Sequence, residues 1–128
     1  MGQEFCVRDG FALPREFHGH PGGISRVVLG PGVRNPDRPA ALDAERLIIH
    51  TNEYQPGGTS GEAHAHADQE QAFYILEGKM EVWVGEKTYL AGPGDCVFLP
   101  RQVPHRHRNA GETPLRFLFI SAVLESRT

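Results

Sequence analysis

The chain has 128 residues and a mass of 14.2 kDa, which is enough for one domain of ordinary size and too few for two. Its formal net charge is −3 with neutral histidines, so no basic surface for a nucleic acid is expected. The longest apolar stretch, around residues 117–124, is far shorter than the roughly 18 residues that cross a bilayer. No signal peptide is visible, and Cys6 and Cys96 are far apart. We therefore expect a cytoplasmic protein with reduced thiols, no nucleic-acid partner and no membrane segment.

The first 45 residues are interrupted every few positions by proline and glycine. Only residues 25–29 have the pattern of a strand, and residues 40–46 are expected to form a helical turn. We interpret residues 1–45 as an irregular N-terminal arm packed on the main domain, with an exposed linker as the alternative. We expect a homodimer, in which the strand at 25–29 either adds to the partner's sheet or closes its own.

From residue 47 onward, short apolar stretches alternate with turn residues, which is typical of an all-β domain. Strands are expected over residues 47–54, 71–76, 79–84, 87–90, 96–99, 105–109 and 115–123. Turn signals recur about every 8–12 residues, as in sandwiches and barrels. The pattern therefore predicts one β-sandwich or barrel domain over residues 46–128.

Three of the seven histidines stand where they can meet. His64 and His66 are two positions apart, so in a strand both imidazoles point to the same face. His105 begins another expected strand, which a β-sandwich can bring beside the first pair. Neutral imidazoles gathered on one inward face are suitable ligands for a divalent transition metal.

These positions resemble the two sequence motifs of the cupin family. The first motif is matched in spacing by Gly58, His64, His66, Gln71 and Gly78. The second motif is matched by Gly94, Pro100, His105 and Asn109. The resemblance covers about residues 45–123 and implies the cupin fold, which is a double-stranded β-helix or jelly-roll β-sandwich barrel.

The resemblance further implies one divalent metal ion (zinc, iron, nickel, manganese or copper), with the ligands His64, His66, Gln71 and His105. The family usually has glutamate at the position of Gln71, and Glu70 stands next to it. Counting back from Gly78 selects Gln71, whereas ligation by Glu70 requires a bulge in the strand. The family also usually has glycine at the position of Gln102, a change expected to alter only the turn there.

An amide in place of a carboxylate leaves the bound ion with its full dipositive charge, which favours Lewis-acid chemistry over metal-centred redox chemistry. We therefore expect an enzyme that acts on a small carbonyl, enolate or aromatic substrate, as an isomerase, cyclase or lyase does. One alternative is a metal-dependent dioxygenase. The other is a non-catalytic cupin that binds a small ligand, and fold analogy alone does not choose between them.

Several other histidines have open interpretations. His107 shares strand parity with His105, so it is either a catalytic general base or an interior histidine held by hydrogen bonds. His50 lies in the middle of a strand, and its face is undecided. Three further polar residues are expected at the surface, namely His18, His20 and Glu62.

Arginines and apolar residues surround the second motif. The arginines form either a solvated face or a clamp for a substrate carboxylate, and they are Arg101, Arg106, Arg108 and Arg116. The apolar residues at 73, 75, 98 and 117–120 form either plain core or cavity walls. As cavity walls, they would select a small, partly apolar or aromatic carbonyl compound.

Overall fold

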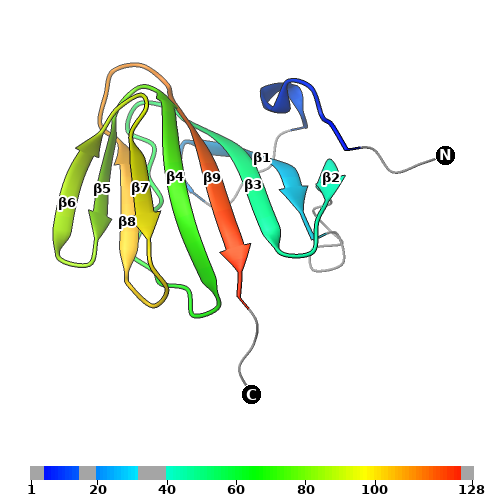
Figure 1. Cartoon of the computed structure of the whole chain (residues 1–128). Helices are drawn as coiled ribbons and strands as arrows, with labels where there is room; N and C mark the ends of the chain where they lie inside the picture. Colours follow the sequence, from blue (N-terminus) through cyan, green and yellow to red (C-terminus); the bar gives the residue numbers. More distant parts are fainter. Residues whose placement is uncertain (1–4, 15–19, 32–39, 125–128) are drawn as a thin grey trace.

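The computed structural model describes residues 5–14, 20–31 and 40–124 (Figure 1). In chain order, the elements are η1 (Gly10–Ala12), β1 (Gly23–Gly30), β2 (Leu42–Asp43), β3 (Leu47–Tyr54), β4 (Gln69–Glu77), β5 (Met80–Val84), β6 (Lys87–Ala91), β7 (Cys96–Leu99), β8 (His105–Asn109) and β9 (Leu115–Val123). A six-stranded sheet has the order β2-β1-β3-β9-β4-β7, and a three-stranded sheet has the order β6-β5-β8. This arrangement confirms the all-β jelly-roll fold. No helix among the described residues is long and apolar enough to cross a bilayer.

Alternation of side chains along the strands places the core between the two sheets. In β4, Phe73 and Ile75 are buried, whereas Tyr74 and Leu76 between and beyond them are exposed. The three-stranded sheet contributes Met80 and Val82, which lie on the same face of β5. The buried apolar core comprises Tyr54, Phe73, Ile75, Met80, Val82, Ala91, Val97, Leu99, Leu115 and Phe117.

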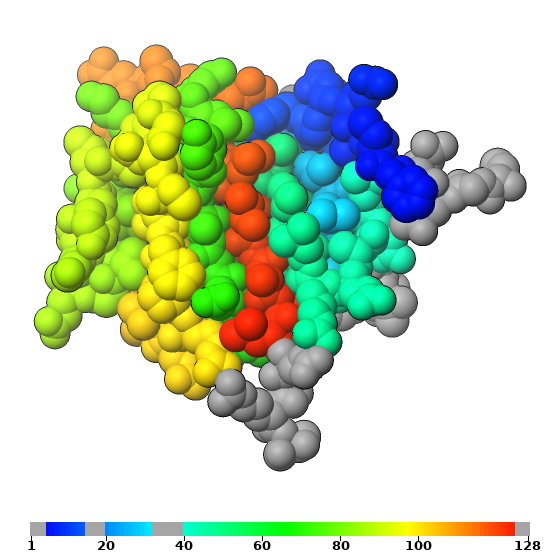
Figure 2. Space-filling view, viewed as in Figure 1, coloured from blue at the N-terminus to red at the C-terminus, as the bar shows by residue number. Residues whose placement is uncertain are grey.

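The N-terminal segment is part of the larger sheet. β1 pairs antiparallel with β3, from Gly23 opposite Tyr54 to Leu29 opposite Ile49. The strand expected at 25–29 therefore closes the sheet of its own chain, and the sheet begins before the domain boundary expected at residue 46. The space-filling view shows the outward face of this sheet, where β7, β4, β9 and β3 lie side by side (Figure 2).

The helical turn expected over residues 40–46 is wrong. Leu42 and Asp43 form the short strand β2, which pairs in parallel with Leu29 and Gly30 at the end of β1. The free edge of β1 offers backbone hydrogen bonds to this segment. One turn of helix offers few bonds for the dihedral angles that it fixes, so the extended pairing is the better solution.

The turn at Gln102 explains why the cupin motif usually has glycine there. Gln102 has a positive φ of 63°, which glycine adopts without strain and other residues rarely adopt. Its backbone N–H donates to the carbonyl of His66 at 2.7 Å. Despite the substitution, the turn before His105 therefore keeps its hydrogen bond to the loop that carries His66.

Candidate metal centre

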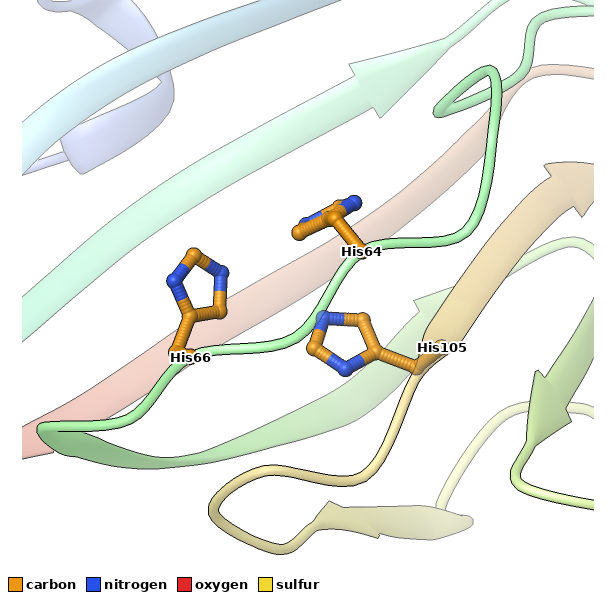
Figure 3. A group of neighbouring side chains, drawn as sticks. All are labelled: His64, His66 and His105. Atoms are coloured by element: carbon orange, nitrogen blue, oxygen red, sulfur yellow. The ribbon is translucent and has the colours of Figure 1, made fainter.

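Three histidines from two segments gather at one point. His64 and His66 lie in the loop between β3 and β4, and His105 is the first residue of β8 (Figure 3). Each offers one ligand atom, and these atoms all lie within 4.8 Å of one another. The imidazole ring centroids are 4.6 to 5.6 Å apart. This spacing suits a single ion held between the three rings.

Backbone hydrogen bonds fix the two segments against each other. The N–H of His64 donates to the carbonyl of His105 at 3.1 Å, and the reverse bond is 2.9 Å long. The strand expected around His64 is therefore a single bridge to β8 within an extended loop. The His64 and His66 rings nevertheless lie beside each other, as expected from their spacing of two residues.

Hydrogen bonds and burial keep the imidazoles ready to coordinate. Nδ1 of His105 lies 3.3 Å from the carbonyl of Val103, and Nδ1 of His64 lies at a longer 3.5 Å from the carbonyl of Glu62. A proton on Nδ1 leaves the Nε2 lone pair free for a metal. Burial, followed by repulsion from His64, lowers the pKa of His105 to about 4 and also lowers the pKa of His66. The neutral ligand form of both is therefore favoured at neutral pH.

Strand parity places Gln71 rather than Glu70 on the cavity side. The Gln71 side chain is 4% exposed and lines the cavity, whereas Glu70 is exposed on the opposite face of β4. No residue in the described ranges donates a hydrogen bond to the Gln71 carbonyl oxygen. An amide that lines the same cavity as the three imidazoles fits the expected donor set, and its ligation of the metal remains a prediction.

The three histidines lie in a cavity of about 350 Å³ between β1, β3, β4, β8 and β9. Three further imidazoles line it, those of His20, His50 and His107. The surface position expected for His20 is wrong, because the turn before β1 directs its half-buried ring inward. His50 also faces the cavity, and its Nδ1 lies 3.1 Å from the Ser25 hydroxyl. Glu62 is exposed, and His18 lies outside the described residues.

His107 is a buried histidine of the cavity wall. It is 4% exposed and packs against Phe73, with ring centroids 4.6 Å apart. Burial is the main cause that lowers its pKa to about 3, and the charges of neighbouring histidines add to the effect. These surroundings favour the interpretation of His107 as an interior histidine. Its role as a general base remains a prediction.

A hydrogen-bonded chain links the buried His107 to the half-buried His20. Nε2 of His107 lies 3.0 Å from the Tyr54 hydroxyl, which lies 2.6 Å from Nδ1 of His20. Nδ1 of His107 has no hydrogen-bond partner among the described residues, so a proton on Nε2 avoids a buried, unpaired N–H. His107 then donates to Tyr54, and Tyr54 donates to His20.

Sequence reasoning missed Tyr54 and His20 as site residues. Tyr54 has the same strand parity as His50 and Asn52, all of which line the cavity, so assigning the face of β3 would have found it. His20 had no comparable signal. Its position depends on the turn at Gly22, whose carbonyl accepts a bond from the N–H of Gln55 at the end of β3.

The arginines near the second motif lie away from the described lining of the cavity. Arg106 stacks on Trp83 at 4.0 Å, and Arg108 pairs with Glu81 at 2.8 Å. Their arrangement favours the solvated face over the carboxylate clamp. The apolar set is divided: Phe73 and Phe119 line the cavity, and the others lie in the core or on the outward face of the sheet.

Comparison with known proteins gives consistent matches. The family described as Cupin domain matches residues 50–121, more than half of the chain. Germin-like protein subfamily 1 member 4 of Arabidopsis thaliana is 31% identical over 129 residues, which cover 86% of this chain and 55% of that protein. The polyketide cyclase RemF of Streptomyces resistomycificus is 26% identical with a TM-score of 0.72, over 95% of this chain and 81% of that chain.

A candidate sugar phosphate isomerase of Acidithiobacillus ferrooxidans is 33% identical with a TM-score of 0.57. The match covers 62% of this chain and 52% of that chain. The chain thus spans about half the length of this protein and of the germin-like protein.

Proposed function

This chain belongs to the cupin domain family, and we propose that it is a metal-dependent enzyme acting on a small carbonyl or enolate substrate. The observation that carries the proposal is the neutral donor set, in which three imidazoles lie within 4.8 Å and the Gln71 amide faces the same cavity. Among the described residues that line the cavity, none is a carboxylate. A divalent metal bound there would keep its full charge and supply a Lewis acid that polarises a carbonyl.

The chain's own residues bind the body of the substrate and exclude water. Ile24, Val27 and Ile48 form an apolar wall on the β1 and β3 side, and Phe73 and Phe119 lie on β4 and β9. A cavity of about 350 Å³ holds a small organic molecule of this partly apolar kind. Neither lysine nor arginine lines the cavity within the described ranges, which favours a carbonyl compound over a phosphate ester.

Proton transfer is assigned to the chain of His107, Tyr54 and His20. Burial raises the pKa of Tyr54, so its hydroxyl keeps its proton at neutral pH and donates one hydrogen bond. Within this hydrogen-bonded chain, the buried His107 donates to the Tyr54 hydroxyl, and the half-buried His20 accepts from it. We propose that His107 takes part through Tyr54 rather than by direct contact with the substrate.

The description of RemF as a polyketide cyclase supports carbonyl chemistry as the class of reaction. We propose a test in D₂O, with the zinc- or nickel-loaded protein and a set of small β-dicarbonyl compounds. Loss of the α-proton signal in ¹H NMR measures enolate formation. The loaded wild type should accelerate this loss, whereas metal-free protein and His64→Ala should not.

The same samples distinguish the two alternatives. Oxygen uptake without α-proton exchange would identify a dioxygenase and overturn the Lewis-acid proposal. Saturable binding of a compound with neither reaction would indicate a non-catalytic binding cupin.

We also propose that the chain forms a homodimer through the outward face of the six-stranded sheet. Large apolar side chains are exposed there, at 43% for Leu47, 41% for Tyr74, 37% for Leu76 and 54% for Phe98. Figure 2 shows this face, which extends over β7, β4, β9 and β3. Several large apolar side chains exposed on one face of a sheet favour an interaction surface, and we propose that a second copy of the chain covers it.

A further inference from the structure

We propose that Gln69 and Ser121 are positioning residues that turn the oxygen of the Gln71 amide towards the three imidazoles. The inference rests on the metal site proposed above. It assigns a role to two residues that neither motif contains.

The three side chains are hydrogen-bonded in a row. Gln69 and Gln71 are two positions apart on β4, so they share a face, and Ser121 of β9 stands opposite Gln71 in the sheet. The Ser121 hydroxyl donates to Oε1 of Gln69 at 2.6 Å. Nε2 of Gln71 donates to the same oxygen at 3.0 Å. Ser121 is 1% exposed and Gln71 is 4% exposed, so water does not compete freely for these bonds.

An amide ligand needs a defined orientation, because its oxygen binds a cation and its NH₂ group repels one. Reversing both amides would direct the Gln71 NH₂ group towards the cavity. The Ser121 hydroxyl proton would then have no acceptor within the described residues, since its hydrogen bond is to Gln69. A buried donor without an acceptor is costly, so the hydroxyl favours the orientation with the Gln71 oxygen towards the imidazoles.

A carboxylate at position 71 would not need to be oriented, because its two oxygens are equivalent as ligands. In a Gln71→Glu background, either oxygen faces the ion and Gln69 can donate to the other. The Ser121 hydroxyl therefore matters only while position 71 is an amide, which gives the proposal a specific signature.

The test measures the dissociation constant for Zn²⁺ by competition with a chromophoric chelator at pH 7.5. Ser121→Ala should weaken binding about tenfold, as the loss of an outer hydrogen bond typically does. Ser121→Thr keeps the hydroxyl and should retain wild-type affinity. In the Gln71→Glu background, Ser121→Ala should leave the affinity unchanged. Thermal melts of each metal-free variant check that the fold is retained.

Three outcomes would overturn the inference. The first is a wild-type dissociation constant for Zn²⁺ in Ser121→Ala. That result would overturn the positioning role but not the metal site itself. The second is an equal loss in both backgrounds, which indicates a general packing effect. The third concerns the side-chain NH₂ protons of Gln71 in metal-free protein, measured by NMR hydrogen exchange. These protons should exchange faster in Ser121→Ala than in the wild type, and equal rates would contradict the row of bonds even if no metal binds.

A wild type that binds no Zn²⁺ or other divalent transition metal would instead overturn the proposed function.

Discussion

The Tyr54 hydroxyl lies 2.6 Å from Nδ1 of His20, so the segment before β1 is bound to the end of β3 inside the cavity. The same hydroxyl lies 3.0 Å from Nε2 of the buried His107. One oxygen therefore connects the N-terminal segment, the larger sheet and the smaller sheet.

Removing this oxygen should destabilise the fold. Tyr54→Phe keeps the ring but leaves Nε2 of His107 buried without its partner. We expect the free energy of unfolding to fall by about 1–3 kcal/mol, measured by urea denaturation. Tyr74→Phe is the matched control, because Tyr74 is 41% exposed and its change should have little effect. Equal effects of the two substitutions would contradict a structural role for the Tyr54 hydroxyl.

The three clustered histidines should bind one metal ion per chain. His64→Ala and His105→Ala each remove one of the imidazoles that lie within 4.8 Å, so each should lose the ion. His50→Ala is the control, because His50 lines the cavity outside this cluster and its loss should leave the metal content unchanged. Elemental analysis of protein purified without chelator provides the measurement. Equal metal content in all three variants would exclude this site.

Burial of His107 should make the metal-free protein sensitive to acid. Its pKa is lowered to about 3, whereas a histidine in an unfolded chain titrates near 6.5. Between these values, the unfolded chain binds a proton that the folded chain does not bind. The free energy of unfolding should therefore be highest above pH 6.5 and fall by up to about 1.4 kcal/mol per pH unit below it.

Urea denaturation of metal-free protein from pH 7.5 to pH 4.5 tests this expectation. His107→Gln cannot take up the proton, so its free energy of unfolding should fall less steeply than that of the wild type. Parallel pH profiles for the two proteins would show that His107 does not contribute.

The strained turn offers a route to higher stability. Gln102 is exposed and has a φ of 63°, so Gln102→Gly removes steric strain without removing a packed side chain. The greater freedom of glycine in the unfolded chain offsets part of the gain. We expect a net increase of about 0.5 kcal/mol in the free energy of unfolding. Gln102→Ala keeps the strain and should give no increase, and a gain of equal size there would refute the explanation.

The proposed dimer depends on the outward face of the larger sheet. Phe98 is 54% exposed on this face, so Phe98→Glu should leave the fold intact and place charges against each other across the interface. Light scattering at micromolar concentration should give a dimer mass for the wild type and a monomer mass for this variant. Trp83→Glu, on the outward face of the smaller sheet, should remain dimeric. A monomeric wild type would remove the proposal.

Regular alternation made most strands predictable from the sequence. The expected strands at 47–54, 96–99, 105–109 and 115–123 agree with the structure at both ends. Turn residues stand near the limits of these strands, and apolar residues predominate in most of them. The strand at 105–109 has no apolar residue and instead alternates buried and exposed polar residues. The same alternation, with the count from Gly78, correctly placed Gln71 on the inward face and Glu70 outside.

Features that depend on contacts between distant segments were not predictable. β2 exists because the edge of β1 accepts it, and the sequence of residues 40–46 does not contain that edge. His20 enters the cavity because Gly22 turns tightly beside Gly58, where an added Cβ would lie 3.0 Å from the Gly58 Cα atom. Neither contact leaves a pattern in the local sequence, so both segments were expected to belong to an irregular arm.

The family match begins at residue 50, but several residues that line the cavity come before it in the chain. His20, Ile24, Val27 and Ile48 all form part of its wall and precede that residue. The segment shared with the family therefore supplies the three clustered imidazoles, while the preceding segment supplies much of the apolar wall. Under the proposed function, exchanging the segment before residue 50 would change part of the substrate-facing wall while leaving His64, His66 and His105 in place.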